Sequence, residues 1–229
     1  MEPTFKPVAD HAVLVSFATE ISDAANQRVV AFDKAIAQAH LKGVCESVPA
    51  FVNILVRFDP IVTDHQELEM ALRGILETVK TATETVGHKI VHVCYDAAFG
   101  PDISNVAQGC NLSEEAVINA HLAGDYHVVM YGFAPGYAYM GGVPEVIQVP
   151  RKPSPVRDVP AGSVIIASAQ CLVSTIVMPT GWSIIGRSPT KILLDQSDQP
   201  FLFDVGDKVT FKRIGLTTYE QMSKEAQNG

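Results

Sequence analysis

Three arginines in the second half of the chain, Arg151, Arg157 and Arg187, are the side chains best suited to bind an anion. A guanidinium group presents its N–H donors as a planar fork, which matches the oxygens of a carboxylate or phosphate. If the three side chains converge in the fold, they form a site for an anionic ligand. Their spacing also allows three separate surface arginines.

The segment 131–144, YGFAPGYAYMGGVP, has an unusual composition, with four glycines, two prolines and four aromatic residues in fourteen positions. Proline fixes φ and glycine allows close approach of the backbone, so the segment is expected to form a stiff loop. Its rings, Phe133 and Tyr137 among them, then offer flat walls to a ligand or partner. The alternative is a turn-rich barrel corner with buried rings.

Common nucleotide, nucleophile and zinc motifs are missing from the sequence. It has no G-x-x-x-x-G-K-[ST] loop, no G-x-G-x-x-G after a strand, no G-x-S-x-G elbow and no H-E-x-x-H. His88, His92 and Cys94 would share one face of a strand, but no carboxylate accompanies them as a further metal ligand. We therefore expect no metal site there and interpret these residues as the exposed face of a sheet.

Composition narrows the class of protein. Of 229 residues, 47% are hydrophobic and 18% are charged, which excludes a disordered chain. A net charge of −8 argues against nucleic acid or an anionic membrane as the main partner. The four scattered cysteines favour reduced thiols, and neither a signal peptide nor a run of 18 apolar residues is present. We expect a cytoplasmic protein.

The elements that must position these residues begin with an alternation of strand and helix patterns over the first 95 residues. Ser22 is expected to cap one helix that Gly43 ends, and Thr63 with Gln66 forms a capping-box pattern before a second helix. The order β-α-β-β-α-β is that of a ferredoxin-like unit. The predicted strands lie at 11–17, 44–48, 51–58 and 89–95.

After Tyr95 the pattern changes to two short helices, at 101–108 and 113–123, the second capped by Ser113. Short apolar segments then follow, separated by Gly and Pro every 8–12 residues, which is typical of a β-barrel or sandwich. The segments are YHVVMYGF, VIQVP, SVIIAS, STIVM, WSIIG, KILL, FLFDVG and DKVTFKRI. We divide the chain into an N-terminal α+β domain, 1–88, and a C-terminal β domain, 89–229.

Ordered motifs in the chain resemble those of the 5-oxoprolinase B-subunit family, also called allophanate hydrolase subunit 1, which includes a bacterial sporulation-kinase inhibitor. One departure is at 168–175, where the family's Gly-Gly-Gln-Thr-Gly-Ile-Tyr-Pro stretch reads Ser-Ala-Gln-Cys-Leu-Val-Ser-Thr. We therefore expect a differently shaped loop there. The motifs are VPAFVNILVRFDP (48–60), VCYDAAFGPDISNVA (93–107), GFAPGYAYMGGVP (132–144), PR (150–151), VPAGSV (159–164), Gln170, GW (181–182) and IIGRSP (184–189).

This resemblance implies a fold and an assembly. The fold is an N-terminal α+β domain followed by a cyclophilin-like β-barrel. The partners are a homologous barrel protein, the C-subunit, and a third component of the lactam-utilisation type. The assembly opens 5-oxoproline to glutamate using ATP, with Mg²⁺, and the single chain is expected to be inactive because it lacks a nucleotide motif of its own.

Such a reaction needs charge stabilisation for phosphoryl oxygens and a clamp for the substrate carboxylate. The resemblance leads us to expect catalytic roles for His121 as a proton carrier, Arg157 as an anion clamp and Gln170 as a partner of the lactam amide. The residues expected to bind substrate or phosphate are Arg151, Arg187, Ser163, Phe133, Tyr137 and Trp182.

Two other functions remain open at this stage. The chain could be a regulatory module whose barrel grips a helical partner and inhibits a sensor histidine kinase. It could also be a carboxyltransferase-type component related to allophanate or urea metabolism. Neighbouring reading frames would discriminate among the three functions.

Overall fold

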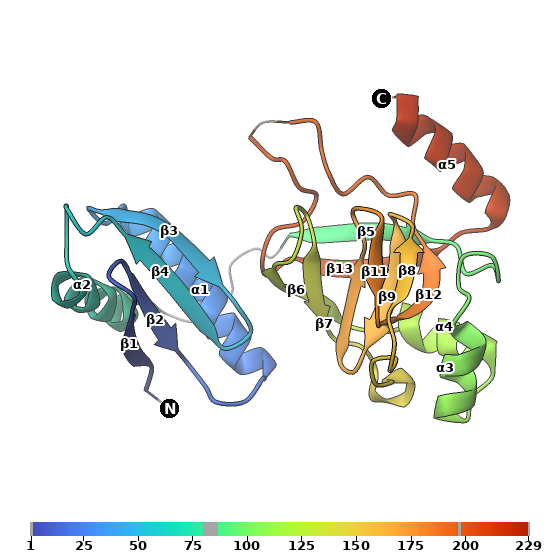
Figure 1. Ribbon diagram of the computed structural model, residues 1–229, viewed down its shortest axis with the longest axis horizontal. Helices are drawn as coiled ribbons and strands as arrows, with labels where there is room; N and C mark the ends of the chain where they lie inside the picture. Colours follow the sequence, from blue (N-terminus) through green and yellow to red (C-terminus); the bar gives the residue numbers. More distant parts are fainter. Residues whose placement is uncertain (1, 80–86, 197, 229) are drawn as a thin grey trace. The chain divides into compact units, whose positions relative to one another are not determined.

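The computed structural model describes residues 2–79, 87–196 and 198–228, with side chains described to residue 226. The chain separates into two compact units, Met1–Thr85 and Val86–Gly229 (Figure 1). Each unit has a hydrophobic core of its own. Within the described ranges, no helix is long and apolar enough to cross a membrane.

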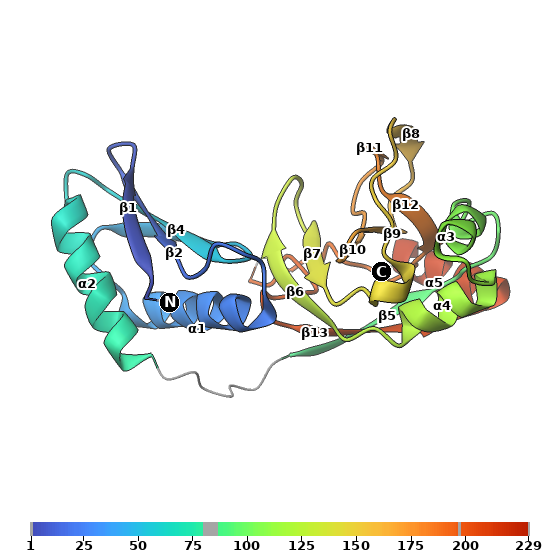
Figure 2. The ribbon, with the colours of Figure 1, turned by 90° about the horizontal axis from the view of Figure 1, so that it is seen from below.

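The N-terminal unit is a four-stranded antiparallel sheet in the order β1-β2-β4-β3, with both helices packed on one face (Figure 2). Alternate residues of β2 and β4 point to that face, where Val15 and Val56 are fully buried against Phe32 of α1 and Leu72 of α2. The elements are β1 Thr4–Val8, β2 Ala12–Ser16, α1 Asp23–Ala39, β3 Val44–Pro49, β4 Asn53–Phe58 and α2 His65–Thr78.

The ferredoxin-like arrangement predicted for this unit is not confirmed. The strand predicted at 89–95 forms β5, His88–Val93, and pairs in parallel with β13, Lys208–Arg213, in the second unit. The sheet edge that it would have occupied is taken by β1, which forms a hairpin with β2. The pairing with a distant strand therefore removes β5 from the first sheet.

Helix starts in this unit follow local capping. The Ser22 hydroxyl accepts from the backbone N–H of Ala25, as predicted. At the second helix the cap is Asp64 and not Thr63, because the Asp64 carboxylate accepts from the backbone N–H groups of Gln66 and Glu67. A carboxylate here also faces the positive end of the helix dipole.

The C-terminal unit is built on a seven-stranded sheet in the order β12-β9-β10-β7-β6-β13-β5. Cys94 and Arg187 exchange two backbone hydrogen bonds of 2.9 Å, which join its two edges into a nearly closed barrel. The elements after β5 are α3 Ile103–Cys110, α4 Glu114–Leu122, β6 Tyr126–Tyr131, β7 Ala138–Gly141, the 3-10 helix η1 Glu145–Ile147, β8 Val156–Val159, β9 Ser163–Ala167, β10 Gln170–Val173, β11 Met178–Thr180, β12 Ser183–Arg187, β13, and α5 Leu216–Asn228.

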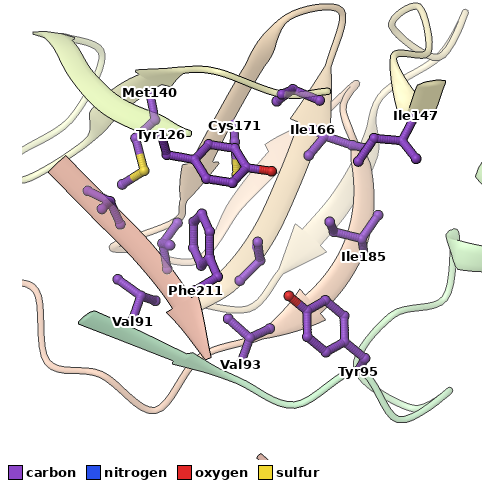
Figure 3. Packing of buried hydrophobic residues seen from close by; sticks show 14 of the residues in the cluster. Val91, Val93, Tyr95, Tyr126, Met140, Ile147, Ile166, Cys171, Ile185 and Phe211 are labelled. Carbon is purple, nitrogen blue, oxygen red and sulfur yellow. The ribbon is translucent and has the colours of Figure 1, made fainter. Parts of the chain in front are cut away.

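The barrel encloses the larger core, which includes Tyr126, Met140, Ile166 and Phe211 (Figure 3). Helices α3 and α4 add side chains to this same cluster. The two helices predicted at 101–108 and 113–123 are thus confirmed, and Ser113 caps α4 as expected.

Four segments predicted as strands are not strands. The stretch 174–178 has no strand up to Val177, and only Met178 enters one, as the first residue of β11. The stretch 146–150 begins in η1, where the N–H of Ile147 donates to the carbonyl of Pro144. The stretches 191–194 and 201–206 share only an isolated bridge between Leu193 and Phe201. Apolar residues in the last three stretches pack on the barrel without joining its sheet.

A second hydrophobic cluster lies on the outer face of β9, β10 and β12 and includes Ile165, Leu172 and Ile184. Their neighbours Ile166, Cys171 and Ile185 belong to the inner core, as the two-residue period of a strand requires. A separate two-stranded sheet of β8 and β11 contributes Val159 and Met178 to the outer cluster.

Candidate functional site

The outer cluster ends in a row of aromatic rings, which we call the aromatic face: Phe133, Tyr137, Tyr139 and Trp182, together with Arg151 and Gln170. Ring centroids lie 5.4 Å apart for Phe133 and Tyr137, 5.5 Å for Tyr137 and Tyr139, and 5.9 Å for Tyr139 and Trp182. The Arg151 guanidinium carbon lies 5.5 Å from the Trp182 ring centroid, a cation–π contact.

Strand register explains why these side chains meet. Gln170 has the same parity on β10 as Leu172, which belongs to the outer cluster, and it pairs with Ala167 of β9. Ala167 is 3% exposed and packs in the same cluster as Trp182. Gln170 therefore lies on the same outer face of the sheet as this cluster.

The polar ends of the aromatic face are available to a ligand. Within the described ranges, no protein hydrogen bond or ion pair engages the Arg151 guanidinium, the Gln170 amide or the Tyr137 hydroxyl. Burial raises the pKa of Tyr137, and nearby Arg151 opposes that rise, so the phenol stays protonated and can donate. A cation, an amide and a phenol beside flat rings can bind a small planar molecule that carries a carboxylate.

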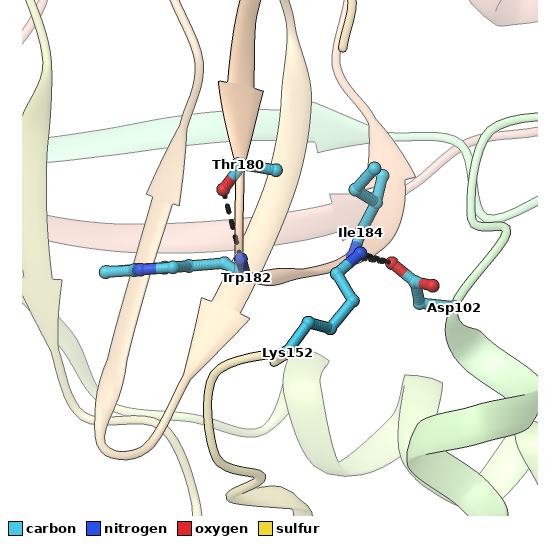
Figure 4. Close-up of polar contacts among 5 residues, drawn as sticks. All are labelled: Asp102, Lys152, Thr180, Trp182 and Ile184. Atoms are coloured by element: carbon cyan, nitrogen blue, oxygen red, sulfur yellow. Dashed lines mark hydrogen bonds and ion pairs between the residues drawn. The ribbon is translucent and has the colours of Figure 1, made fainter. Parts of the chain in front are cut away.

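An ion pair that the sequence did not predict holds the start of β12, next to Trp182 (Figure 4). The Asp102 carboxylate accepts from Lys152 Nζ at 2.6 Å and from the backbone N–H of Ile184 at 2.7 Å. The backbone N–H of Lys152 donates to the carbonyl of Gly181 at 2.6 Å, so Arg151 is fixed next to Trp182. The only trace of this ion pair in the sequence was the Pro101-Asp102 pair before α3, and that pair predicted no more than the start of a helix.

Arg187 does not converge with Arg151. The two lie near opposite ends of β12, because Arg151 contacts Trp182, just before the strand, and Arg187 is its last residue. At about 3.3 Å per residue, five steps separate Trp182 from Arg187 by roughly 16 Å. The Arg187 guanidinium carbon lies instead 4.9 Å from the ring centroid of Phe99.

Among the described residues, neither Ser163 nor Arg157 contacts a ring of the aromatic face. Ser163 is fully buried, and its hydroxyl donates to the carbonyl of Pro160, so it stabilises the turn before β9. Arg157 is exposed on β8, whose Val159 packs in the outer cluster.

His121 lies in the barrel core and does not reach the aromatic face. Its Nδ1 is 2.7 Å from the Tyr95 hydroxyl, and its Nε2 is 3.5 Å from Cys171 Sγ. Its exposure is 0%, and burial lowers its pKa from 6.5 to about 3. The imidazole is therefore neutral at pH 7 and has no access to a solvent-borne substrate, contrary to the role expected of a proton carrier.

The aromatic loop combines both arrangements considered from the sequence, an exposed ring and a buried one. Phe133 is 73% exposed with φ of 71°, a left-handed conformation that is unusual for a large side chain. Tyr137 is only 4% exposed and packs in the outer cluster. Phe133 is thus free to contact a partner, and Tyr137 is mainly a wall of the barrel.

The fold and the sequence place the chain among known proteins. Residues 3–203 match the family described as carboxyltransferase domain, subdomain C and D. The fold resembles that of urea amidolyase from Kluyveromyces lactis, with a TM-score of 0.80 and 14% identity, over 99% of this chain and 16% of that one. A crystal structure of TTHA0988 gives a TM-score of 0.79 at 30% identity over 90% of this chain, which spans only 40% of that protein.

A curated relative, the 5-oxoprolinase B-subunit of Bacillus subtilis (strain 168), is 36% identical over 231 aligned positions, which cover 96% of each chain. Relatives of the same name from Escherichia coli O157:H7 and Haemophilus influenzae are 31% and 30% identical. The chain belongs to the 5-oxoprolinase B-subunit family.

Proposed function

We propose that this chain is the B-subunit of an ATP-dependent 5-oxoprolinase. With the C-subunit and a third component, the assembly would hydrolyse the lactam of 5-oxo-L-proline to L-glutamate as ATP is hydrolysed. The observation that carries the proposal is the 36% identity to a 5-oxoprolinase B-subunit along nearly the whole of both chains. The carboxyltransferase alternative is supported only by the shared fold and the family description.

The aromatic face supports this role with chemistry suited to a lactam that carries a carboxylate. Arg151, held over Trp182, would pair with the substrate carboxylate through its N–H fork. The Gln170 amide can donate to the lactam oxygen and accept from the lactam N–H. The Tyr137 hydroxyl, kept protonated by burial, adds a further donor. Arg157 on neighbouring β8 stays a proposed clamp for an anionic group.

The residues of this chain do not fit ATP by themselves. A triphosphate site needs several convergent N–H donors or cations, usually from a glycine-rich loop before a helix. The sequence has no such loop, and Arg151 and Arg187 lie near opposite ends of β12. We assign nucleotide binding to the assembled enzyme, with the partner proteins completing the site, and assign substrate binding to this chain.

Exposed Phe133 supports contact with another protein. The loop that carries it is tied to the end of β10 by a 2.8 Å hydrogen bond from the Thr175 hydroxyl to the carbonyl of Pro135. Ile176 and Val177, which follow directly, are 42% and 63% exposed. Three exposed apolar side chains on two loops that a hydrogen bond joins suit the contact with the C-subunit.

Co-expression tests the assembly. The chain should co-purify with the C-subunit encoded in the same genome, and the complex with the third component should hydrolyse ATP only when 5-oxo-L-proline is present. The chain alone should release no phosphate. A stable complex without substrate-dependent turnover would contradict the proposal, and capture of a sensor kinase in place of the C-subunit would favour the regulatory alternative.

A further inference from the structure

A cleft of about 270 Å³ lies in the C-terminal unit, away from the aromatic face. One wall is α5, through Tyr219, Ser223 and Ala226, and the opposite wall is the segment 188–193 that follows β12. Figures 1 and 2 both place α5 beside that end of β12. The volume suits a small organic molecule, since a water molecule occupies only about 30 Å³.

Hydrogen bonding leaves the cleft rich in donors. Ser188 Oγ accepts from the backbone N–H of Thr190, and Thr190 Oγ1 accepts from the backbone N–H of His92. Each hydroxyl therefore keeps its O–H hydrogen for another acceptor. Among the described residues, the hydroxyls of Tyr219 and Ser223 have no partner either. The cleft thus presents several hydroxyl groups that can donate a hydrogen bond to a ligand.

Arg187 adjoins this cleft and lacks an anion. Gly162 lines the cleft, and a Cβ atom added to it would lie 3.6 Å from Arg187 Cγ, so the stem of Arg187 lies directly beside the cleft. Its guanidinium stacks on Phe99, whose ring lies 4.4 Å from that of Tyr219. Arg187 Nε is buried without a hydrogen-bond partner, and no carboxylate in the described part of the chain pairs with the side chain. The side chain as a whole is half-buried, and its buried Nε–H is a donor that an anion beside the cleft could satisfy.

The remaining lining favours an organic anion over an inorganic one. Ala161, Pro189, Ile192 and Leu193 give the cleft apolar walls, which a bare oxyanion would not use. Lys191 adds a second cation, although Asp195 pairs with it at 2.6 Å. We propose that the cleft is a second binding site of this chain, specific for a small organic carboxylate held by Arg187 and the surrounding hydroxyls.

The site is tested by titrating the full chain with small molecules and monitoring the backbone amide NMR shifts. The probes are 5-oxo-L-proline, L-glutamate and acetate, with neutral 2-pyrrolidinone and inorganic phosphate for comparison. At least one carboxylate should saturate, with shifts centred on Gly162, Ser188 and Lys191, and 2-pyrrolidinone should bind at least about tenfold more weakly. No saturation by any carboxylate, or shifts centred on Trp182 instead, would overturn the proposal. Phosphate binding as tight as that of the carboxylates would also overturn it.

Variants separate a binding role from a structural one. Arg187→Gln should weaken the carboxylate at least about tenfold, while Lys212→Gln, which removes an exposed cation of β13, should not. Ala226→Phe should block the cleft from α5 without touching Arg187, and Lys224→Phe on the exposed side of α5 is its control. Unchanged affinity in both folded Arg187→Gln and folded Ala226→Phe would contradict the site. This binding is measured on the single chain, so it can stand or fall independently of 5-oxoprolinase activity in the assembly.

Discussion

His121 makes the stability of the barrel unit depend on pH in a way that can be calculated. Burial lowers its pKa from 6.5 to about 3. Between these values the unfolded chain binds a proton that the folded chain excludes, so stability decreases as the pH is lowered through this window. Each pH unit below 6.5 costs about 1.4 kcal/mol, which gives a loss of about 2 kcal/mol at about pH 5 and about 4 kcal/mol near pH 3.

The assay is urea unfolding monitored by Trp182, the single tryptophan of the chain, which lies in the barrel unit. Between about pH 7.5 and 5, wild type should lose about 2 kcal/mol more than His121→Gln, whose side chain does not titrate. Because only the change in the free energy of unfolding with pH is compared, any pH-independent destabilisation by the substitution cancels. His88→Gln, at an exposed histidine of the same unit, should retain the wild-type dependence. Equal dependence in wild type and His121→Gln would refute the reasoning.

Three further predictions concern the aromatic face and its support. Phe133→Ala should weaken association with the C-subunit about tenfold, measured by ultracentrifugation, and leave the melting temperature unchanged. Tyr137→Ala should instead lower the free energy of unfolding by about 3 kcal/mol, measured by calorimetry, because it opens a cavity. A stable Tyr137→Ala together with a destabilised Phe133→Ala would contradict the burial of Tyr137 and the exposure of Phe133. Asp102→Ala should destabilise the barrel by about 2–3 kcal/mol in urea unfolding, because it leaves Lys152 and the Ile184 N–H without their partner; a change under about 0.5 kcal/mol would contradict this. Arg157→Lys should lower kcat/KM of the assembly by a factor that corresponds to a loss of about 1–3 kcal/mol in transition-state stabilisation, with little change in the free energy of unfolding. An unchanged kcat/KM would exclude Arg157 as an anion clamp.

Local signals in the sequence were sufficient for most elements. Ser22 and Ser113 marked the helix starts that the structure has, since a hydroxyl cap acts within three residues. The pairing of β5 with β13 was not predictable, because it joins segments more than 100 residues apart and no local pattern encodes a partner. Its consequence, the replacement of a ferredoxin-like edge strand by β1, was missed for the same reason.

The roles expected of the candidate site residues stay predictions, but the structure shows which of these residues lie together. Ring contacts link Phe133, Tyr137, Tyr139 and Trp182, and Arg151 joins them at Trp182. Gln170 shares the outer face by strand register, and spacing alone did not require any of this. Residue type could not distinguish an exposed histidine from a buried one, and His121 proved to be a core residue once Tyr95 and Cys171 were placed around it. The separation of Arg187 from Arg151 follows from the length of β12, a property of the folded barrel.

The proposed 5-oxoprolinase role is tested by conversion of 5-oxo-L-proline to L-glutamate in the reconstituted assembly. With this chain, the C-subunit, the third component and Mg²⁺–ATP, glutamate should accumulate in proportion to the phosphate released. Omission of this chain should abolish glutamate formation, and Arg151→Gln should reduce kcat/KM by at least about tenfold. Full turnover in the absence of this chain, or a complete assembly that forms no glutamate, would contradict the account.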